Sequence, residues 1–175
     1  MKFDGGINMN NKFYMPVMKS KHGEFLALSK LRDPVKKNVI PLLEVTPLEW
    51  SAEGKKPKTI EDHLDLFCKR YAQNWNTNCC FIDTVLMKHK ENDDTHRIEY
   101  IFNRLFEKSV CPIPVLHVHN SNSFVAAISG IKGKYGIQEF GLRIIPDELT
   151  SPEIESEINS ILEKIGITAN ACHLI

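Results

Sequence analysis

The stretch Val39–Val45 (VIPLLEV) has a single charged residue, Glu44, and is otherwise apolar. Such a run is typical of a strand in a parallel sheet whose two faces are both covered by other parts of the protein. Runs of similar character recur along the whole chain, with helix-like segments between them. They are Tyr14–Lys19, Cys79–Val85, Ile113–His119, Phe140–Ile145 and Ala171–Ile175.

The segments between these runs carry apolar residues at helical spacing, for example Phe25, Leu28 and Leu31. The predicted helices are Glu24–Leu31, Ile60–Trp75, Thr95–Lys108, Ser123–Ile131 and Pro152–Ile165. Strands that alternate with helices predict βα units and a parallel sheet. We therefore expect an α/β fold, an incomplete (β/α) TIM-barrel-like fold with about six parallel strands and five helices, whereas a complete barrel has eight of each.

The predicted domain organisation is a flexible leader over residues 1–12 and one partial barrel domain over 13–175. The leader is polar and rich in Gly and Asn, and no linker interrupts the rest. In an open barrel the first and last strands would be sheet edges, which other chains can pair with. We therefore expect a homo-oligomer, or a second polypeptide that completes the sheet.

The composition argues against two classes of protein, nucleic-acid-binding proteins and proteins that span a membrane. Lys plus Arg and Asp plus Glu are equal at 22 each, so a basic surface for nucleic acid is not indicated. No apolar stretch approaches the roughly 20 residues that span a membrane. The five cysteines lie within apolar patterns without metal-type spacing, which is typical of reduced, structural thiols in a cytoplasmic protein.

Polar residues stand near the carboxyl ends of successive predicted strands, where barrel enzymes and binding proteins have their sites. An ionisable residue inside an apolar strand is costly unless it is paired or functional. The candidate catalytic residues are Glu44, Asp83, His117, His119 and Arg143, and the candidate ligand-binding residues are Lys19, Lys21 and Trp50. The alternative interpretation is a set of structural ion pairs, Lys19–Glu44 and Asp83–Arg143.

Two kinds of chemistry fit these candidates. A carboxylate base with a histidine acid needs no cofactor. The absence of a cofactor is the leading expectation, and a polar pocket without catalysis stays open beside the acid–base site. The weaker alternative is a divalent metal, zinc or manganese, held by His117 and His119 on one face of a strand together with Asp83. Gly130–Gly136 (GIKGKYG) follows a helix instead of preceding one, so we expect a helix exit and not a phosphate loop.

The sequence around the first two runs resembles the phage-type beta protein family. The resemblance lies in Tyr14–Leu28 (YMPVMKSKHGEFLAL), which follows the pattern Y-x-P-x-x-K-x-K-x-G-E-x-x-A-L, and in Ile40–Val45 (IPLLEV). It implies a soluble, barrel-like protein from phages or from bacterial mobile and defence-related loci. Family members are longer, so the resemblance also implies that this chain lacks the last strands, as a truncated or split gene product would.

Two functions follow as expectations. The leading one is a cytoplasmic ligand- or protein-binding component in a phage–host or antiviral-defence setting. The alternative is a barrel hydrolase or phosphodiesterase-like enzyme that uses the cluster of Glu, Asp, His and Arg, with or without a metal.

Overall fold

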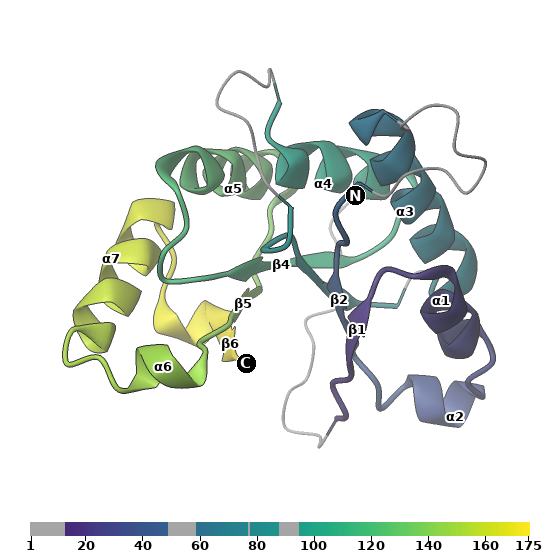
Figure 1. Ribbon diagram of the computed structural model, residues 1–175, viewed down its shortest axis with the longest axis horizontal. Helices are drawn as coiled ribbons and strands as arrows, with labels where there is room; N and C mark the ends of the chain where they lie inside the picture. The colour runs from purple at the N-terminus through teal and green to yellow at the C-terminus, as the bar shows by residue number, and fades with distance from the viewer. Residues whose placement is uncertain (1–12, 49–58, 77, 88–94) are drawn as a thin grey trace.

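The computed structural model describes residues 13–48, 59–76, 78–87 and 95–175, and these form one α/β unit (Figure 1). The predicted leader lies outside the described residues. Six parallel strands form one sheet in the order β1-β2-β3-β4-β5-β6. They are β1 (Val17–Lys19), β2 (Leu42–Glu44), β3 (Cys80–Asp83), β4 (Pro112–Leu116), β5 (Phe140–Leu142) and β6 (Cys172–Leu174).

The strand order identifies the architecture. Each strand pairs with the next one along the chain, and the order never reverses. A doubly wound sheet would reverse its order at a switch point, whereas a (β/α) barrel adds every strand on the same side. The fold is therefore the predicted partial TIM-barrel-like arrangement, with β1 and β6 at the two edges of the described sheet.

The strands are shorter than the apolar runs that predicted them. In the first run only Val17–Lys19 forms a strand, and Tyr14 makes an isolated bridge to Val39. Pro16 stands between the bridge and the strand, and proline has no N–H to donate to a ladder. Apolar runs therefore locate the strands correctly but overestimate their length.

Seven helices occur in the described residues, and five of them were predicted. They are α1 (His22–Ser29), α2 (Asp33–Lys36), α3 (Ile60–Asn74), α4 (Arg97–Glu107), α5 (Asn122–Tyr135), α6 (Pro146–Leu149) and α7 (Ile154–Ile165). The two additional helices, α2 and α6, span four residues each and have a proline in their first turn. They are too short to show a periodic apolar pattern.

The prediction that α5 ends at Ile131 was wrong. The helix continues through Gly133 to Tyr135, and the residue that caps it, Gly136, adopts a left-handed conformation with φ of 67°. Glycine adopts this conformation without the steric cost that a side chain would impose. Most of the glycine-rich segment is therefore helix, and neither a phosphate loop nor an exit loop.

The sheet has an apolar layer on each face. On the outer face, residues such as Leu43, Cys80 and Ile82 pack with the helices in the larger core. On the inner face, Leu42 and Phe81 pack with residues of β4 in a smaller core. Side chains two apart on a strand share a face, so Glu44 and Asp83 point to the inner side with Leu42 and Phe81.

The inner face is packed tightly around Gly141 on β5. A Cβ atom built on this glycine would lie 2.8 Å from Ile175 Cδ1, 3.0 Å from Phe81 Cδ1 and 3.2 Å from Val115 Cγ2. Side chains from β3, β4 and the end of the chain thus converge over the place where Gly141 has none. The interior below the strand ends is filled by side chains, as in complete barrels.

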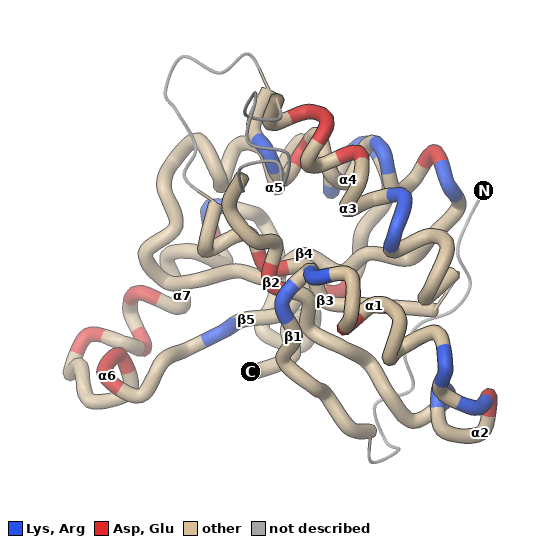
Figure 2. Tube along the Cα trace, turned by 45° about the vertical axis from the view of Figure 1, so that its right-hand side comes forward, with Lys and Arg blue, Asp and Glu red and all other residues tan. Residues whose placement is uncertain are grey.

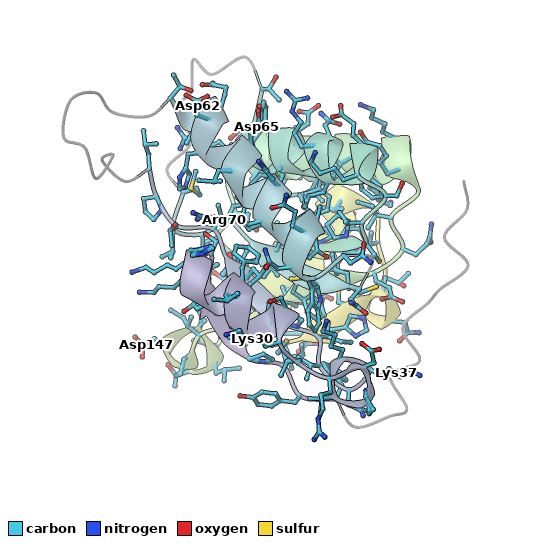
Figure 3. The ribbon with its side chains drawn as sticks, turned by 90° about the vertical axis from the view of Figure 1, so that its right-hand side faces the viewer. Lys30, Lys37, Asp62, Asp65, Arg70 and Asp147 are labelled. Atoms are coloured by element: carbon cyan, nitrogen blue, oxygen red, sulfur yellow. The ribbon has the colours of Figure 1, made fainter. Side chains whose placement is uncertain are left out.

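Charged side chains lie mainly on the outer surface of the helices, as Figure 3 shows for Asp65 on α3, whose side chain is 51% exposed. In Figure 2, acidic positions gather on α6 and α7 and basic ones near α2. None of the described helices is both long enough and apolar enough to cross a membrane.

Candidate functional site at the strand ends

The parallel register sets three charged residues in one row across neighbouring strands. Lys19 on β1 is the register partner of Glu44 on β2, and Glu44 is the partner of Asp83 on β3. Register partners in a sheet point to the same face. The sequence prediction that these residues stand at one level of the sheet is therefore correct.

Arg143 connects this row to the other side of the sheet. It follows β5, and its Nη1 atom donates to Glu44 Oε1 at 2.8 Å and to Asp83 Oδ2 at 2.7 Å. The expected Asp83–Arg143 ion pair is therefore present. Glu44 pairs with Arg143, and within the described residues Lys19 makes no ion pair. We call Glu44, Asp83, His117 and Arg143 the strand-end cluster.

Asp83 is the centre of the strand-end cluster, and its side chain is 0% exposed. Its Oδ1 atom accepts from the backbone N–H of Val85 at 2.8 Å and contacts Nε2 of His117 at 3.1 Å. Burial alone would raise the pKa of Asp83, but hydrogen bonds and charge from His117, the Val85 N–H and Arg143 together lower it. Asp83 is therefore an ionised carboxylate whose hydrogen-bonding partners are fixed.

Burial and hydrogen bonding also have opposite effects on the pKa of Arg143. Burial alone would lower the pKa of its guanidinium, whereas hydrogen bonds to Glu44 and Asp83 raise it overall. The single positive charge of Arg143 thus forms ion pairs with two carboxylates, those of Glu44 and Asp83.

His117 is held in place by its own backbone as well as by Asp83. Strand β4 ends at Leu116, and the N–H of His117 donates to Asn120 Oδ1 at 2.7 Å. The contact between His117 Nε2 and Asp83 fixes the ring orientation and leaves Nδ1 as the second nitrogen. A buried carboxylate that orients an imidazole is an arrangement used in acid–base catalysis and in ligand binding.

The prediction that His117 and His119 share one strand face was wrong. Both residues lie in the turn after β4, where the N–H of Asn120 donates to the carbonyl of His117 at 3.1 Å. His119 is exposed and its Nε2 lies 3.6 Å from Glu148 Oε1 on α6. The alternation of a strand no longer applies once the chain turns, so the two imidazoles have different carboxylate partners.

A hollow of about 410 Å³ opens beside His117, and we call it the α5 hollow. It lies between the end of β3 and the beginning of α5. Its lining includes Asp83, Thr84, His96, His117, His119 and Ser121. Glu44 and Arg143 are not among its lining residues, so the strand-end cluster meets this hollow only through Asp83 and His117.

Two helices begin at the α5 hollow. The hydroxyl of Ser121 accepts from the N–H of Phe124 at 3.2 Å and so caps α5, and His96 Nδ1 accepts from the N–H of Ile98 and caps α4. Ser121, Phe124 and His96 all belong to the lining. The amino ends of helices carry partial positive charge, which favours an anionic group at this place.

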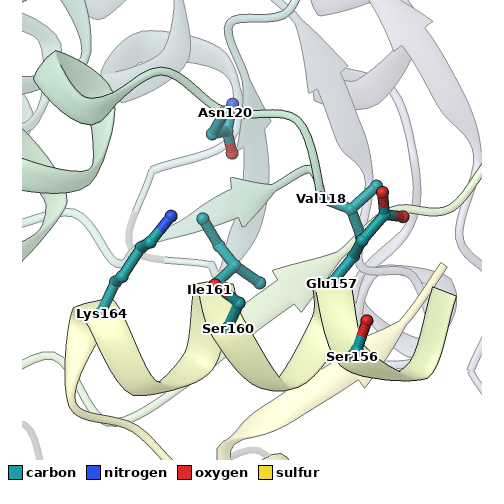
Figure 4. A pocket seen from close by; sticks show the side chains of 7 residues that line it. All are labelled: Val118, Asn120, Ser156, Glu157, Ser160, Ile161 and Lys164. Carbon is teal, nitrogen blue, oxygen red and sulfur yellow. The ribbon is translucent and has the colours of Figure 1, made fainter. Parts of the chain in front are cut away.

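A second hollow, of about 310 Å³, lies between α7 and the turn after β4 (Figure 4). Ser156, Ser160 and Lys164 face it from α7, and Val118 and Asn120 face it from the turn. Asn120 also lines the α5 hollow, so this side chain separates the two depressions. The second hollow contains no member of the strand-end cluster.

Two of the three predicted ligand-binding residues, Lys19 and Lys21, are not part of the α5 hollow. Lys19 and Lys21 are exposed at the end of β1 and the start of α1. Trp50 lies outside the described residues. Within the described part of the chain, no group of three or more His, Cys, Asp or Glu side chains is arranged to hold a metal ion. Of the alternative metal set, Asp83 and His117 are in contact, while His119 contacts Glu148.

Sequence reasoning missed Thr84, His96, Asn120 and Ser121 as lining residues. Thr84 follows β3 directly, Asn120 lies in the turn between β4 and α5, and His96 and Ser121 precede helices. Their positions in the connections after strands were the available signal. In a βα barrel the residues after a strand and before the next helix form the mouth. A prediction limited to charged residues within the strands does not include these connecting positions.

The fold and the strand-end cluster define a protein of the partial (β/α) barrel class with a charged cluster at its carboxyl-end mouth. The model of the Beta protein family matches residues 14–175, and the chain belongs to this family. The match extends the likeness seen in the first 45 residues over nearly the whole described chain. Comparison with curated proteins found no match. Comparison with solved structures also found none.

Proposed function

We propose that this protein binds a small ligand with an anionic group, a phosphate or a carboxylate, in the α5 hollow. The observation that supports this most is the contact of 3.1 Å between His117 and Asp83 at the edge of the hollow. His117 is 13% exposed while Asp83 is fully buried. A histidine that is oriented from behind by a buried carboxylate presents its other nitrogen to a ligand.

The charges around the hollow support an anionic ligand. His96, His117 and His119 contribute three imidazoles to its lining, and the amino end of α5 contributes N–H groups. Among the described lining residues Asp83 is the one acidic residue, and Arg143 and His117 already satisfy it. An anion entering this space would therefore meet donors and partial positive charge.

The setting proposed for this binding is the cytoplasm, in a phage–host or defence-related context, with the protein acting as a binding component. The five cysteines, all free thiols, support a reducing compartment. Membership of the Beta protein family supports the setting only through the resemblance described above.

A titration with inorganic phosphate and, separately, with acetate tests the proposal. We expect saturable shifts of the His117 ring resonances in NMR spectra. His117→Ala should weaken binding about ten-fold or more, because a hydrogen bond to a charged group contributes about 1.5–3 kcal/mol. His22→Ala is the matched control, since His22 is exposed on α1. Absence of saturable binding of both anions, or unchanged binding by His117→Ala, would contradict the proposal.

The second candidate function is hydrolysis, as in a phosphodiesterase-like barrel. The oriented His117–Asp83 pair favours it, because such a pair can take a proton from water or give one to a leaving group. A simple phosphodiester such as bis(p-nitrophenyl) phosphate, offered with and without Zn²⁺ or Mn²⁺, tests this function. Turnover that His117→Ala abolishes and His22→Ala retains would favour the enzyme over the binding protein.

A further inference from the structure

Two cysteines lie side by side at the end of the sheet opposite to the α5 hollow. Cys79 directly precedes β3 and Cys111 directly precedes β4. The N–H of Cys80 donates to the carbonyl of Cys111 at 3.3 Å, which aligns the two segments. The two Sγ atoms are 2.7 Å apart.

Buried side chains of α3 and of Trp75, the residue that follows it, hold the backbone of both cysteines. Trp75 Nε1 donates to the carbonyl of Cys79 at 3.0 Å, and the hydroxyl of Tyr71 contacts the carbonyl of Cys111 at 3.3 Å. Trp75 and Tyr71 are both 0% exposed. Neighbouring strands lie about 4.8 Å apart, within the range of Cα separations that disulfides span. The fold thus already holds the two residues at a distance suited to a covalent link.

The two thiols differ in accessibility from Cys68 and Cys80, and they differ from Cys172 in having each other as partners. Cys79 and Cys111 are half-buried, whereas Cys68 and Cys80 are fully buried. The hydrogen bond from the Cys79 thiol lowers the pKa of Cys111, against the opposing effects of burial and of Glu139. The same hydrogen bond, followed by burial, raises the pKa of Cys79. In this contact the Cys79 thiol is the donor and the Cys111 sulfur the acceptor, so Cys111 is the sulfur placed to act as the thiolate.

We propose that Cys79 and Cys111 are a redox-active pair that forms a reversible disulfide when a hydroperoxide is present. The thiolate of Cys111 attacks the terminal peroxide oxygen, the O–O bond breaks, and the alcohol leaves with a proton, giving a sulfenic acid on Cys111. The sulfur of Cys79 then attacks the Cys111 sulfur and displaces water. In sum, two thiols and one hydroperoxide give one disulfide, one alcohol and one water. A dithiol then reduces the disulfide to two thiols by exchange and is itself oxidised.

The link would join β3 to β4 at their amino ends, while the carboxyl ends of the same strands lead to Asp83 and His117. It would tie together two segments that the side chains of Tyr71 and Trp75 already hold. We therefore expect the thermal midpoint to rise on oxidation, since a cross-link restricts the unfolded chain. This inference does not depend on which ligand occupies the α5 hollow.

The test is treatment of the full chain with one equivalent of hydrogen peroxide, followed by thiol counting in denaturant and peptide mapping without reductant. We expect the count to fall by two from the five free thiols, with Cys79 and Cys111 in one linked peptide pair. Dithiothreitol should restore all five. Retention of every thiol, or a link that involves Cys172 instead, would overturn the proposal.

Single variants separate the two roles. Cys79→Ser should leave a sulfenic acid on Cys111 that dimedone traps, because the resolving thiol is gone. Cys111→Ser should slow peroxide consumption at least ten-fold. Cys172→Ser is the matched control, since Cys172 is also half-buried, and it should form the link at the wild-type rate. Equal dimedone labelling of Cys172 and Cys111 would show that the pair has no special reactivity.

Discussion

Arg143 and Glu44 lie 99 positions apart in the sequence, and their side chains meet at 2.8 Å across the interior of the partial barrel. The same nitrogen of Arg143 also contacts Asp83, so a residue that follows β5 connects to the ends of both β2 and β3. The curvature of the sheet makes this contact possible, because a flat sheet would hold β5 and β2 three strands apart. The ion pairs therefore stabilise the closure of the barrel and, through Asp83, the orientation of His117.

The first prediction concerns the stability that Arg143 provides. Arg143→Met should lower the free energy of unfolding by about 3–5 kcal/mol, because it leaves Glu44 and the fully buried Asp83 without their shared cation. Urea denaturation measures this loss. Arg104→Met is the matched control, since Arg104 pairs with Asp65 at the surface, where both side chains are 42–51% exposed. A surface pair contributes about 0–1 kcal/mol, so equal losses in the two variants would contradict a central role for Arg143.

The second prediction concerns pH. The pKa of Asp83 is lowered in the folded protein, so the carboxylate contributes stability above its unfolded value of about 3.9. That contribution disappears as the pH falls through the folded pKa, because the protonated carboxyl loses its bonds to Arg143 and His117. Asp83→Asn should therefore be less stable than the wild type at neutral pH, and the difference should shrink at pH values below about 4.

Thermal unfolding across a pH series, from neutral to strongly acid, measures this difference. Asp65→Asn is the control, since Asp65 is half exposed and its variant should differ little from the wild type at any pH. A gap between wild type and Asp83→Asn that stays constant on acidification would mean that Asp83 is not the group that titrates.

The third prediction concerns the packing of the inner face. Gly141→Ala places a Cβ atom 2.8 Å from Ile175 Cδ1 and 3.0 Å from Phe81 Cδ1. We expect a loss of about 1–2 kcal/mol, at the lower end for overpacking, because the end of the Ile175 side chain can rotate away. Combining it with Ile175→Val removes the nearest atom and should recover part of the loss.

Gly133→Ala is the matched control for Gly141→Ala. Gly133 lies inside α5, and a Cβ atom there would meet nothing within 4 Å. Alanine is favoured over glycine in a helix by up to about 1 kcal/mol, so this variant should be more stable. The two substitutions should thus change stability in opposite directions, and destabilisation by both would point to a cause other than packing at Gly141.

The sequence was sufficient to predict the strands of the parallel sheet. It also predicted that Lys19, Glu44 and Asp83 stand at the same level of that sheet. Apolar runs located every strand, and the position of one polar residue near each run's end placed Glu44 and Asp83 in register. It could not show that Arg143 reaches Glu44, because that contact depends on sheet curvature, which no local pattern encodes. The alternative interpretation paired Glu44 with Lys19, its neighbour in the register, whereas Lys19 is exposed in the structure.

The two histidines illustrate a different limit. Spacing alone placed His117 and His119 on one face, on the assumption that the strand continues. The strand ends at Leu116 because the Asn120 side chain accepts the N–H of His117, and the chain then turns toward α5. A polar run such as Asn120–Asn122 is a turn signal in its own right. Giving that signal priority over strand alternation would have separated the two imidazoles.

The last prediction concerns the free edge of β1. Among the described residues β1 pairs only with β2. Val17 on β1 is 53% exposed, and Tyr14, in the bridge before β1, is 68% exposed. An edge strand with apolar side chains is a template for pairing with another chain. We expect two copies to associate through this edge, so light scattering should report a mass that rises with concentration. Val17→Lys should shift the midpoint of association to at least ten-fold higher concentration, because a charge opposes edge-to-edge pairing.

Val35→Lys is the matched control, since Val35 is 40% exposed on α2, away from the sheet, and its variant should associate like the wild type. A constant monomer mass at every concentration would show that the β1 edge needs no partner.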